Sequence, residues 1–137
     1  MYLPYPPSIN NYWIASGHRR FISQRGKDFK AAVSEYVIEH DIPKLGGIQV
    51  IVDIILRPQN KRLMDIDNCI KPILDAIQDA GVIDDDVQVA KVTIERGLVH
   101  KGGSCVVMVF PASQEVNMRR ENWSVGCTTS DIRAALD

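Results

Sequence analysis

Two aspartates, Asp65 and Asp67, stand two residues apart where an apolar helical pattern begins, and Lys71 follows Asp67 by about one helical turn. One aspartate at a helix start is ordinary, because its carboxylate accepts from free backbone N–H groups and favours the helix dipole. A second one so close is not explained in this way, since two carboxylates repel unless a cation or donors intervene. Hard oxygen ligands at this spacing suit Mg²⁺ or Mn²⁺.

Other metal chemistries fit the sequence poorly. An EF-hand calcium loop counted from Asp65 needs glycine at its sixth position and glutamate at its twelfth, where Ile70 and Ala76 stand. The three histidines are scattered, and the three cysteines lack the C-x-x-C spacing of zinc or redox sites. We therefore expect reduced cysteines and no zinc.

A second acidic cluster, residues 84–86, follows the same helical pattern. A solvated turn is the ordinary interpretation of any one of these aspartates. Asp86 directly precedes a strand pattern that begins near Val87. If that strand lies beside the strand predicted over residues 48–56, Asp86 can approach Asp65 and Asp67. Periodicity alone leaves this adjacency open.

Lys71 lies four residues after Asp67 and four before Asp75. At this spacing the side chains share a helix face, so a run of surface ion pairs is one interpretation. The functional alternative gives Lys71 a scissile phosphate or its attacking water as partner. Spacing does not decide between the two.

The pattern along the chain predicts an α+β fold. The expected elements are a strand at 2–5, a loop over 6–20, a helix at 24–40 capped by Ser23, a strand at 48–56, a helix at 66–80 that becomes regular near 69 because of Pro72, and strands from about 87 and over 102–111. This order favours a small mixed β-sheet with helices packed on one face. We divide the chain into a domain, 1–111, and a C-terminal extension, 112–137, where Ser130 can cap a helix at 131–136.

The composition of the 137 residues, 45% hydrophobic and 24% charged, is that of one globular domain. The net charge of −1 argues against a simple basic nucleic-acid binder. Residues 72–90, however, hold five aspartates and no lysine or arginine, and basic residues flank them. A divalent cation among those carboxylates would lower the repulsion of phosphate. No apolar run is long enough for a membrane span and no signal-peptide pattern is present, so we expect a cytoplasmic protein.

Three separated motifs resemble the RusA family of Holliday junction resolvases. They are P-P-S-I-N-N at 6–11, D-I-D-N-C-I-K at 65–71 and G-V-I-D-D-D-V-Q-V at 81–89, and the likeness runs from about Pro6 to Val109. The resemblance implies a RusA-like fold and a homodimeric, Mg²⁺-dependent endonuclease, with Mn²⁺ as a substitute. Such enzymes cut four-way DNA junctions symmetrically and are often encoded by phages and prophages.

The resemblance also implies roles for individual residues. Asp65, Asp67 and Asp86 match the metal-binding aspartates, with Asp85 as the alternative third, and Lys71 matches the catalytic lysine. Supporting positions around them are Asn68, Asp75, Asn10 and Asn11.

Basic side chains outside these motifs are candidates for contacts with the DNA backbone. They are Arg19, Arg20, Arg25, Lys27, Lys61, Arg62 and Lys101. A solvated surface charge is the ordinary interpretation of each one alone. Trp13 and Tyr12 in the predicted loop either stack on an unpaired base or close the edge of a core. The basic run before Asp65 is shorter than the family's, because Leu63 and Met64 follow Arg62.

Three other functions compete with a resolvase. One is a nuclease for other branched DNA such as flaps, and a second is a non-catalytic module that binds DNA junctions. The third is a structural protein whose carboxylates are ordinary helix caps and ion pairs.

Overall fold

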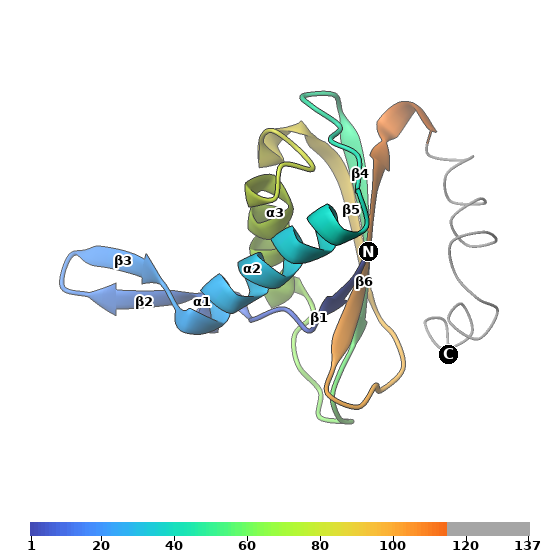
Figure 1. Cartoon of the computed structure of the whole chain (residues 1–137). Coiled ribbons are helices and arrows are strands. Elements are labelled where there is room, and N and C mark those ends of the chain that lie inside the picture. Colours follow the sequence, from blue (N-terminus) through green and yellow to red (C-terminus); the bar gives the residue numbers. More distant parts are fainter. Residues whose placement is uncertain (115–137) are drawn as a thin grey trace.

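The structure is a computed structural model, and it describes residues 1–114 (Figure 1). Its strands are β1 (Tyr2–Pro4), β2 (Trp13–Ser16), β3 (Arg19–Ile22), β4 (Val50–Arg57), β5 (Val89–Arg96) and β6 (Ser104–Pro111). Its α-helices are α1 (Ile9–Tyr12), α2 (Gln24–Glu39) and α3 (Ile70–Asp79), and short 3-10 turns lie at η1 (Asp67–Cys69), η2 (Asp86–Gln88) and η3 (Ala112–Gln114). The helix expected at 131–136 and its cap Ser130 lie outside the described residues.

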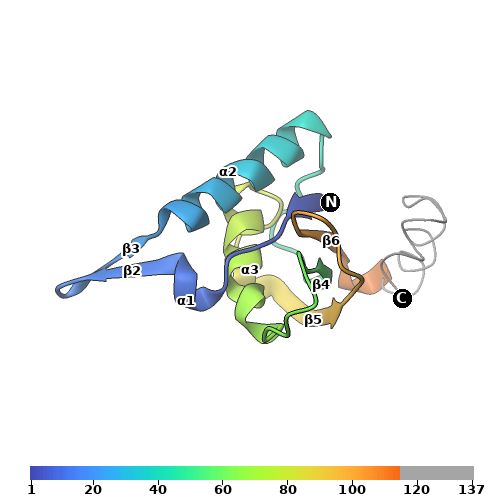
Figure 2. The same cartoon turned by 90° about the horizontal axis from the view of Figure 1, so that it is seen from below.

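Four strands form one mixed sheet in the order β1-β6-β4-β5. β4 pairs parallel with β5 and antiparallel with β6, which in turn pairs antiparallel with β1. Helices α2 and α3 both cover the same face of this sheet, as Figures 1 and 2 show from two directions. The predicted α+β fold with helices on one face is confirmed. The adjacency of β5 and β4, which periodicity left open, is present in the structure.

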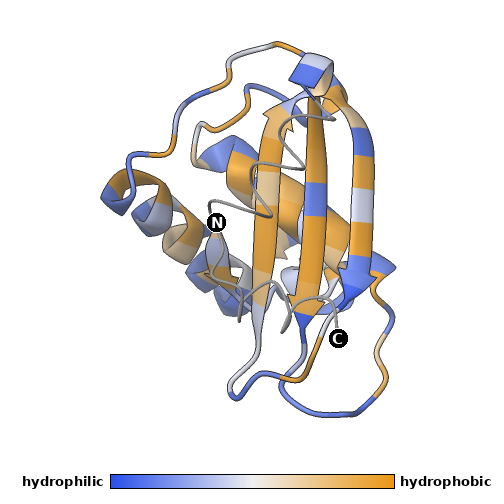
Figure 3. Ribbon diagram, turned by 90° about the vertical axis from the view of Figure 1, so that its right-hand side faces the viewer, coloured by the Kyte–Doolittle hydropathy of each residue, from blue (hydrophilic) through white to orange (hydrophobic). Residues whose placement is uncertain are grey.

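The core lies between the sheet and the two helices. Alternate residues of β4 point into it, and they are Val50, Val52, Ile54 and Leu56. They pack against the apolar stripes of α2 and α3, which include Phe29, Val33, Ile73 and Ile77. This face of the strand is therefore the core face. Figure 3 shows that the strands of the sheet consist largely of hydrophobic residues. An exception in β4 is Asp53, which is buried and accepts a hydrogen bond from Thr93 Oγ1 at 2.5 Å.

Helix α3 is the crossover between two parallel strands. The chain leaves β4, passes the loop 58–66 and the tight turn η1, and then runs through α3 and η2 into β5. The regular helix begins at Ile70, so Pro72 stands in its first turn, where its missing N–H does no harm. Gly81, with φ of 82°, follows the helix end. The regular helix thus begins close to the predicted residue 69, directly after the tight turn η1.

The loop predicted over residues 6–20 is wrong. Residues 9–12 form a single helical turn, and β2 and β3 form an antiparallel hairpin joined by Gly17 and His18. The many turn-forming residues before Tyr12 masked the strands that follow. Gly17 has a φ of 63°, which suits the first position of a two-residue hairpin turn.

The base of this hairpin is fixed to α2. Ser23 N donates to Tyr12 O at 2.8 Å, and Ser23 Oγ donates to Asn11 O at 2.5 Å while it caps α2 through Gly26 N. A Cβ atom at Gly26 would stand 2.7 Å from Ile22 Cγ2 and 2.9 Å from Tyr12 Cδ2. Only glycine allows the hairpin to approach the helix this closely.

Cys69 and Cys105 are buried, unpaired thiols, and Cys127 lies outside the described residues. Within residues 1–114 no helix combines the length and the apolar content that crossing a lipid bilayer would require.

The turn before β5 is held by one buried amide. The Gln88 side chain accepts from the backbone N–H groups of Asp84 and Asp85 and donates to Gly46 O and Ile48 O, each at 2.7–3.0 Å. Only 8% of Gln88 is exposed. The amide therefore ties the acidic turn to the chain that enters β4.

We expect Gln88→Ala to lower the free energy of unfolding by about 2–4 kcal/mol, because buried donors and acceptors lose their partners. Urea denaturation measures this change. Gln24→Ala is the control: its exposed amide donates only to Asp28, so a loss of less than about 0.5 kcal/mol is expected. Equal losses in the two variants would contradict the role given to Gln88.

Candidate active site

Lys71 joins two carboxylates from different elements. Its Nζ lies 2.9 Å from Asp75 Oδ1, one turn further along α3, and 2.8 Å from Asp86 Oδ2 in η2. The exposed fractions of the side chains are 50% for Lys71, 18% for Asp75 and 30% for Asp86. Two carboxylates thus converge on one cation at a position that solvent reaches.

This arrangement favours the charged forms of Asp86 and Lys71. The hydrogen bond from Lys71, followed by one with Asp85, lowers the pKa of Asp86 below its ordinary value of 3.8. Hydrogen bonds to Asp86 and Asp75 raise the pKa of Lys71 above 10.5, against the opposing effect of desolvation. The lowered pKa of Asp86 means that its contribution to stability is present above pH 3.8 and is lost as the pH falls through the folded-state value.

The backbone around Asp86 fixes its direction. Asp86 N donates to Gln78 Oε1 of α3 at 3.1 Å. Asp85, by contrast, caps η2, because its Oδ1 accepts from Val87 N at 3.0 Å. Asp85 therefore has a local structural role, and Asp86 is the residue of the cluster that meets Lys71.

Asp67 opens η1 one turn before Lys71, and its side chain is exposed, as is that of Asp65. The parallel register pairs Val50 with Val89, so Asp86 lies at the starting end of β4, whereas Asp65 follows its far end. The ten residues of α3, a span of about 15 Å, separate the two ends. The pairing of β4 with β5 thus does not by itself bring Asp86 close to Asp65 and Asp67. The long side chain of Lys71 spans part of the distance between the helix entrance and Asp86.

No group of three His, Cys, Asp or Glu side chains within residues 1–114 is gathered closely enough to hold a metal ion. The structure brings together Lys71, Asp75 and Asp86, and leaves Asp65 and Asp67 as exposed carboxylates at the helix entrance. Asp75, which the resemblance implies only as a supporting residue, is as close to the shared cation as Asp86 is.

Asp65 borders a separate groove of about 740 Å³. Side-chain amides from three parts of the chain line it, namely Asn10, Asn11, Gln59, Asn60 and Asn68. Arg25 and Arg62 add positive charge, and Tyr5 and Met64 add apolar surface. The predicted supporting residues Asn10, Asn11 and Asn68 therefore do meet, beside Asp65 rather than beside Lys71.

All seven predicted DNA-contacting residues are exposed. Arg19 and Arg20 belong to β3, and Arg25 and Lys27 to the first turn of α2. The other three lie in the loops that follow β4 and β5 and are Lys61, Arg62 and Lys101.

Three positioning residues escaped the sequence analysis. Gln78 and Gln88 hold the turn of Asp86, and Arg96 Nη2 donates to Met64 O at 2.5 Å, next to Asp65. Gln88 stands two residues after the acidic cluster, and this proximity is the only signal that the sequence offers for it. The partner of Arg96 is 32 residues away and has no sequence signal.

Comparison with known proteins places this chain in one family. Residues 4–109 match the family described as Endodeoxyribonuclease RusA. The crossover junction endodeoxyribonuclease rusA of Enterobacteria phage HK97 is 31% identical over 101 residues, which cover 74% of this chain and 84% of the relative. Those of Shigella sonnei strain Ss046 and Enterobacteria phage 82 are each 32% identical over 114 residues, 82% of this chain and 94% of each relative.

The match shows that this protein is related to DNA endonucleases. The chain belongs to the RusA family, as its three motifs indicated.

We expect Lys71→Met to raise the pKa of Asp86 to 3.8 or above, because the carboxylate loses its main cationic partner and stays next to Asp75. Carbon-detected NMR titration of the carboxyl carbons measures it.

Lys30→Met is the matched control, since Lys30 pairs with Asp79 at 2.6 Å on another face of α3. It should leave the pKa of Asp86 unchanged. An unaltered Asp86 titration in Lys71→Met would show that the ion pair is not formed in solution.

Proposed function

We propose that this protein is a divalent-metal-dependent endodeoxyribonuclease that resolves four-way DNA junctions. Membership of the RusA family supports the reaction class, since the relatives are named crossover junction endodeoxyribonucleases. The observation that carries the proposal is the exposed Lys71 ammonium held between Asp75 and Asp86. Ordinary surface pairs do not explain why two carboxylates from separate elements meet on one accessible cation.

The oxygen donors around Lys71 fit a hard divalent cation such as Mg²⁺, or Mn²⁺ in its place. Asp75 and Asp86 already aim oxygens at one cationic position. The family resemblance assigns the metal to Asp65, Asp67 and Asp86. Binding by that set requires the helix entrance and the η2 turn to approach each other when metal and DNA bind. Asp75 is a further candidate ligand beside Asp86.

The chemistry proposed is hydrolysis of a phosphodiester by water. Attack on phosphorus forms one P–O bond and breaks another, leaving a phosphate on one strand end and a hydroxyl on the other. Lys71 stabilises the negative charge on the phosphate or orients the water. A bound divalent ion supplies Lewis-acid polarisation of the phosphodiester and a more acidic water. The exposed carboxylates accept hydrogen bonds from that water.

We infer a homodimer as the acting form. A four-way junction has approximate two-fold symmetry, so a C2 dimer presents two equal sites to opposite strands and can cut them symmetrically. Action on DNA is in keeping with the cytoplasmic location expected from the sequence.

We expect symmetric cuts in a mobile synthetic four-way junction with Mg²⁺ and none without it. Asp67→Asn should lower the cleavage rate at least about 100-fold, the scale on which one transition-state contact acts. It should leave junction affinity equal or higher, because a charge that repels phosphate is removed. Gel mapping of the cuts on all four strands measures the rate, and fluorescence anisotropy measures the affinity.

Asp84→Asn is the control, since Asp84 stands in the acidic turn next to Asp85 and Asp86 and has no proposed catalytic role. Parental cleavage by Asp67→Asn would remove Asp67 from the site. Calorimetric Mg²⁺ titration of Asp65→Asn and Asp75→Asn separates the two ligand sets. Flap and linear substrates in the same assay separate a resolvase from a general nuclease for branched DNA, and binding without any cleavage would indicate a non-catalytic module.

We expect junction affinity to fall with a slope of about −4 or steeper in a plot of log affinity against log salt, as several phosphate contacts require. Arg62→Ala at the groove should flatten this slope by about 1. Lys44→Ala is the control, because Lys44 lies near Gly81 at the other end of α3. A salt-independent affinity would argue against recognition through phosphates.

A further inference from the structure

The β2–β3 hairpin projects from the body of the molecule (Figures 1 and 2). Its register places Trp13 opposite Ile22 and Ile14 opposite Phe21. Large apolar side chains normally face a core, but here Ile14 is 51% and Phe21 50% exposed. About half of each of these two residues is therefore open to solvent.

Arginines lie nearer the tip on both faces of the hairpin. Arg20 pairs with Ala15 on the face of Trp13, and Arg19 pairs with Ser16 on the face of Phe21. Successive strand residues point to opposite faces, so each face carries an aromatic side chain near the base and an arginine beyond it. This combination of ring and guanidinium suits nucleic acid, because rings stack on bases and guanidinium groups bind phosphates.

The charge of this segment supports the same ligand. Residues 9–27 contain no aspartate or glutamate, whereas they contain Arg19, Arg20, Arg25 and Lys27. Two copies of such a cationic segment repel each other, and a polyanion attracts both. A hairpin used to bind a second copy of the chain would need acidic partners, which this segment does not provide.

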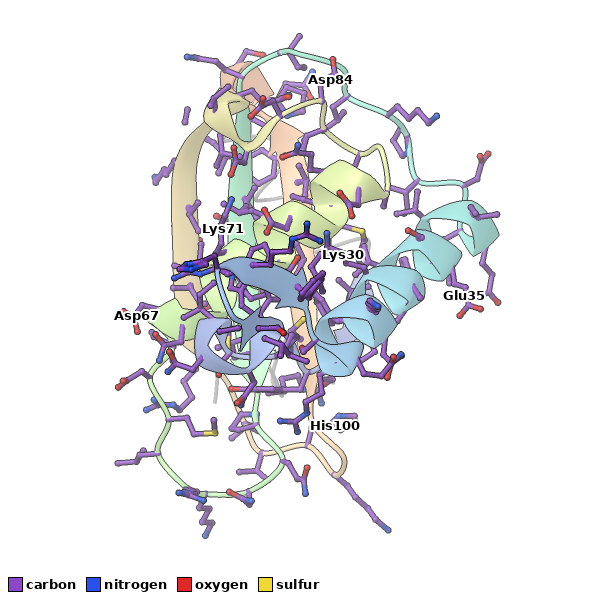
Figure 4. All side chains as sticks on the ribbon, turned by 90° about the vertical axis from the view of Figure 1, so that its left-hand side faces the viewer. Lys30, Glu35, Asp67, Lys71, Asp84 and His100 are labelled. Carbon is purple, nitrogen blue, oxygen red and sulfur yellow. The ribbon has the colours of Figure 1, made fainter. Side chains whose placement is uncertain are left out.

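The hairpin stands beside the candidate active site. The helical turn α1 at its base contacts both η1, which contains Asp67, and α3, which contains Lys71. Figure 4, which looks along the hairpin from its tip, shows Asp67, Lys71 and Lys30 around it. The contacts of Ser23 and Gly26 with the hairpin base fix its direction relative to these residues.

We propose that the β2–β3 hairpin recognises the branch point of the DNA. It enters the opening where the strands exchange, the Phe21 ring stacks on a base exposed there, and Arg19 and Arg20 contact phosphates on its two sides. A linear duplex offers no such opening, so the hairpin confers preference for branched DNA. This inference rests on the proposed function, because it takes branched DNA as the substrate.

The test is Phe21→Ala, chosen because Trp13 also packs edge-on against the buried Tyr12, with ring centroids 5.1 Å apart. We expect affinity for a four-way junction to fall about 10-fold, within the range that loss of one base–aromatic stack produces. Affinity for a linear duplex of the same sequence should change less than about twofold, because phosphate contacts remain. The control is Ile38→Ala, since Ile38 is 81% exposed at the end of α2, away from the hairpin.

A second readout places 2-aminopurine at the branch point of the junction. When the parent protein binds, stacking of Phe21 on 2-aminopurine should change the fluorescence of 2-aminopurine. Phe21→Ala should abolish that change. Circular dichroism confirms that both variants are folded, and Phe21→Tyr, which keeps the ring, should restore the junction affinity.

Equal weakening of junction and duplex binding by Phe21→Ala would overturn the proposal in favour of general phosphate contact. Light scattering that shows a dimer becoming a monomer in Phe21→Ala would overturn it in favour of a subunit interface. If the parent protein cuts junctions and Phe21→Ala binds them unchanged, the hairpin inference fails while the proposed function stands. If the parent neither prefers nor cuts junctions, the proposed function fails as well.

Discussion

One ammonium group connects the parts of this protein on which its chemistry depends. Lys71 belongs to the first turn of α3, yet its Nζ reaches Asp75 a turn later and Asp86 in the turn that precedes β5. Since like charges on Asp75 and Asp86 would otherwise repel, the ammonium allows both carboxylates to face one position. The same contact keeps Lys71 charged and partly exposed, which is the state that a phosphate-binding lysine requires.

The crossover topology explains why the site is extended rather than compact. A parallel pair of strands places the end of one and the start of the next at opposite ends of the sheet, and α3 must bridge them. Asp65 and Asp67 therefore stand at the entrance of the helix, and Asp86 stands beyond its exit. Asp67 in η1 and then Lys71 and Asp75 on α3 follow one another at four-residue spacing between these two ends. The result is an extended acidic strip with a lysine at its centre.

Two buried polar side chains fix the positions of the acidic turn and of the hairpin. The Gln88 amide satisfies four backbone groups and so holds the acidic turn against the start of β4. Ser23 caps α2 and binds Asn11 O with the same hydroxyl, so the hairpin and the helix are placed together. Each of these contacts determines the direction of a charged or aromatic surface. The groove lined by Asn10, Asn11 and Asn68 borders Asp65.

The sequence by itself determined the sheet strands, the two long helices and the list of charged residues, because apolar periodicity of 2 and 3.6 residues reflects which side of each element is buried. The position of Pro72 in the first turn of α3 and the N-cap of α2 by Ser23 were also predictable, since both follow from local backbone chemistry. The tertiary structure alone decided that residues 13–22 form a projecting hairpin, because their apolar side chains pair with each other and not with the core. It alone decided that Asp75 and Asp86 both pair with Lys71, while Asp65 lines a groove with three asparagines. The physical reason is that residue spacing within an element carries no information about strand direction, nor about which end of a helix a later turn will meet.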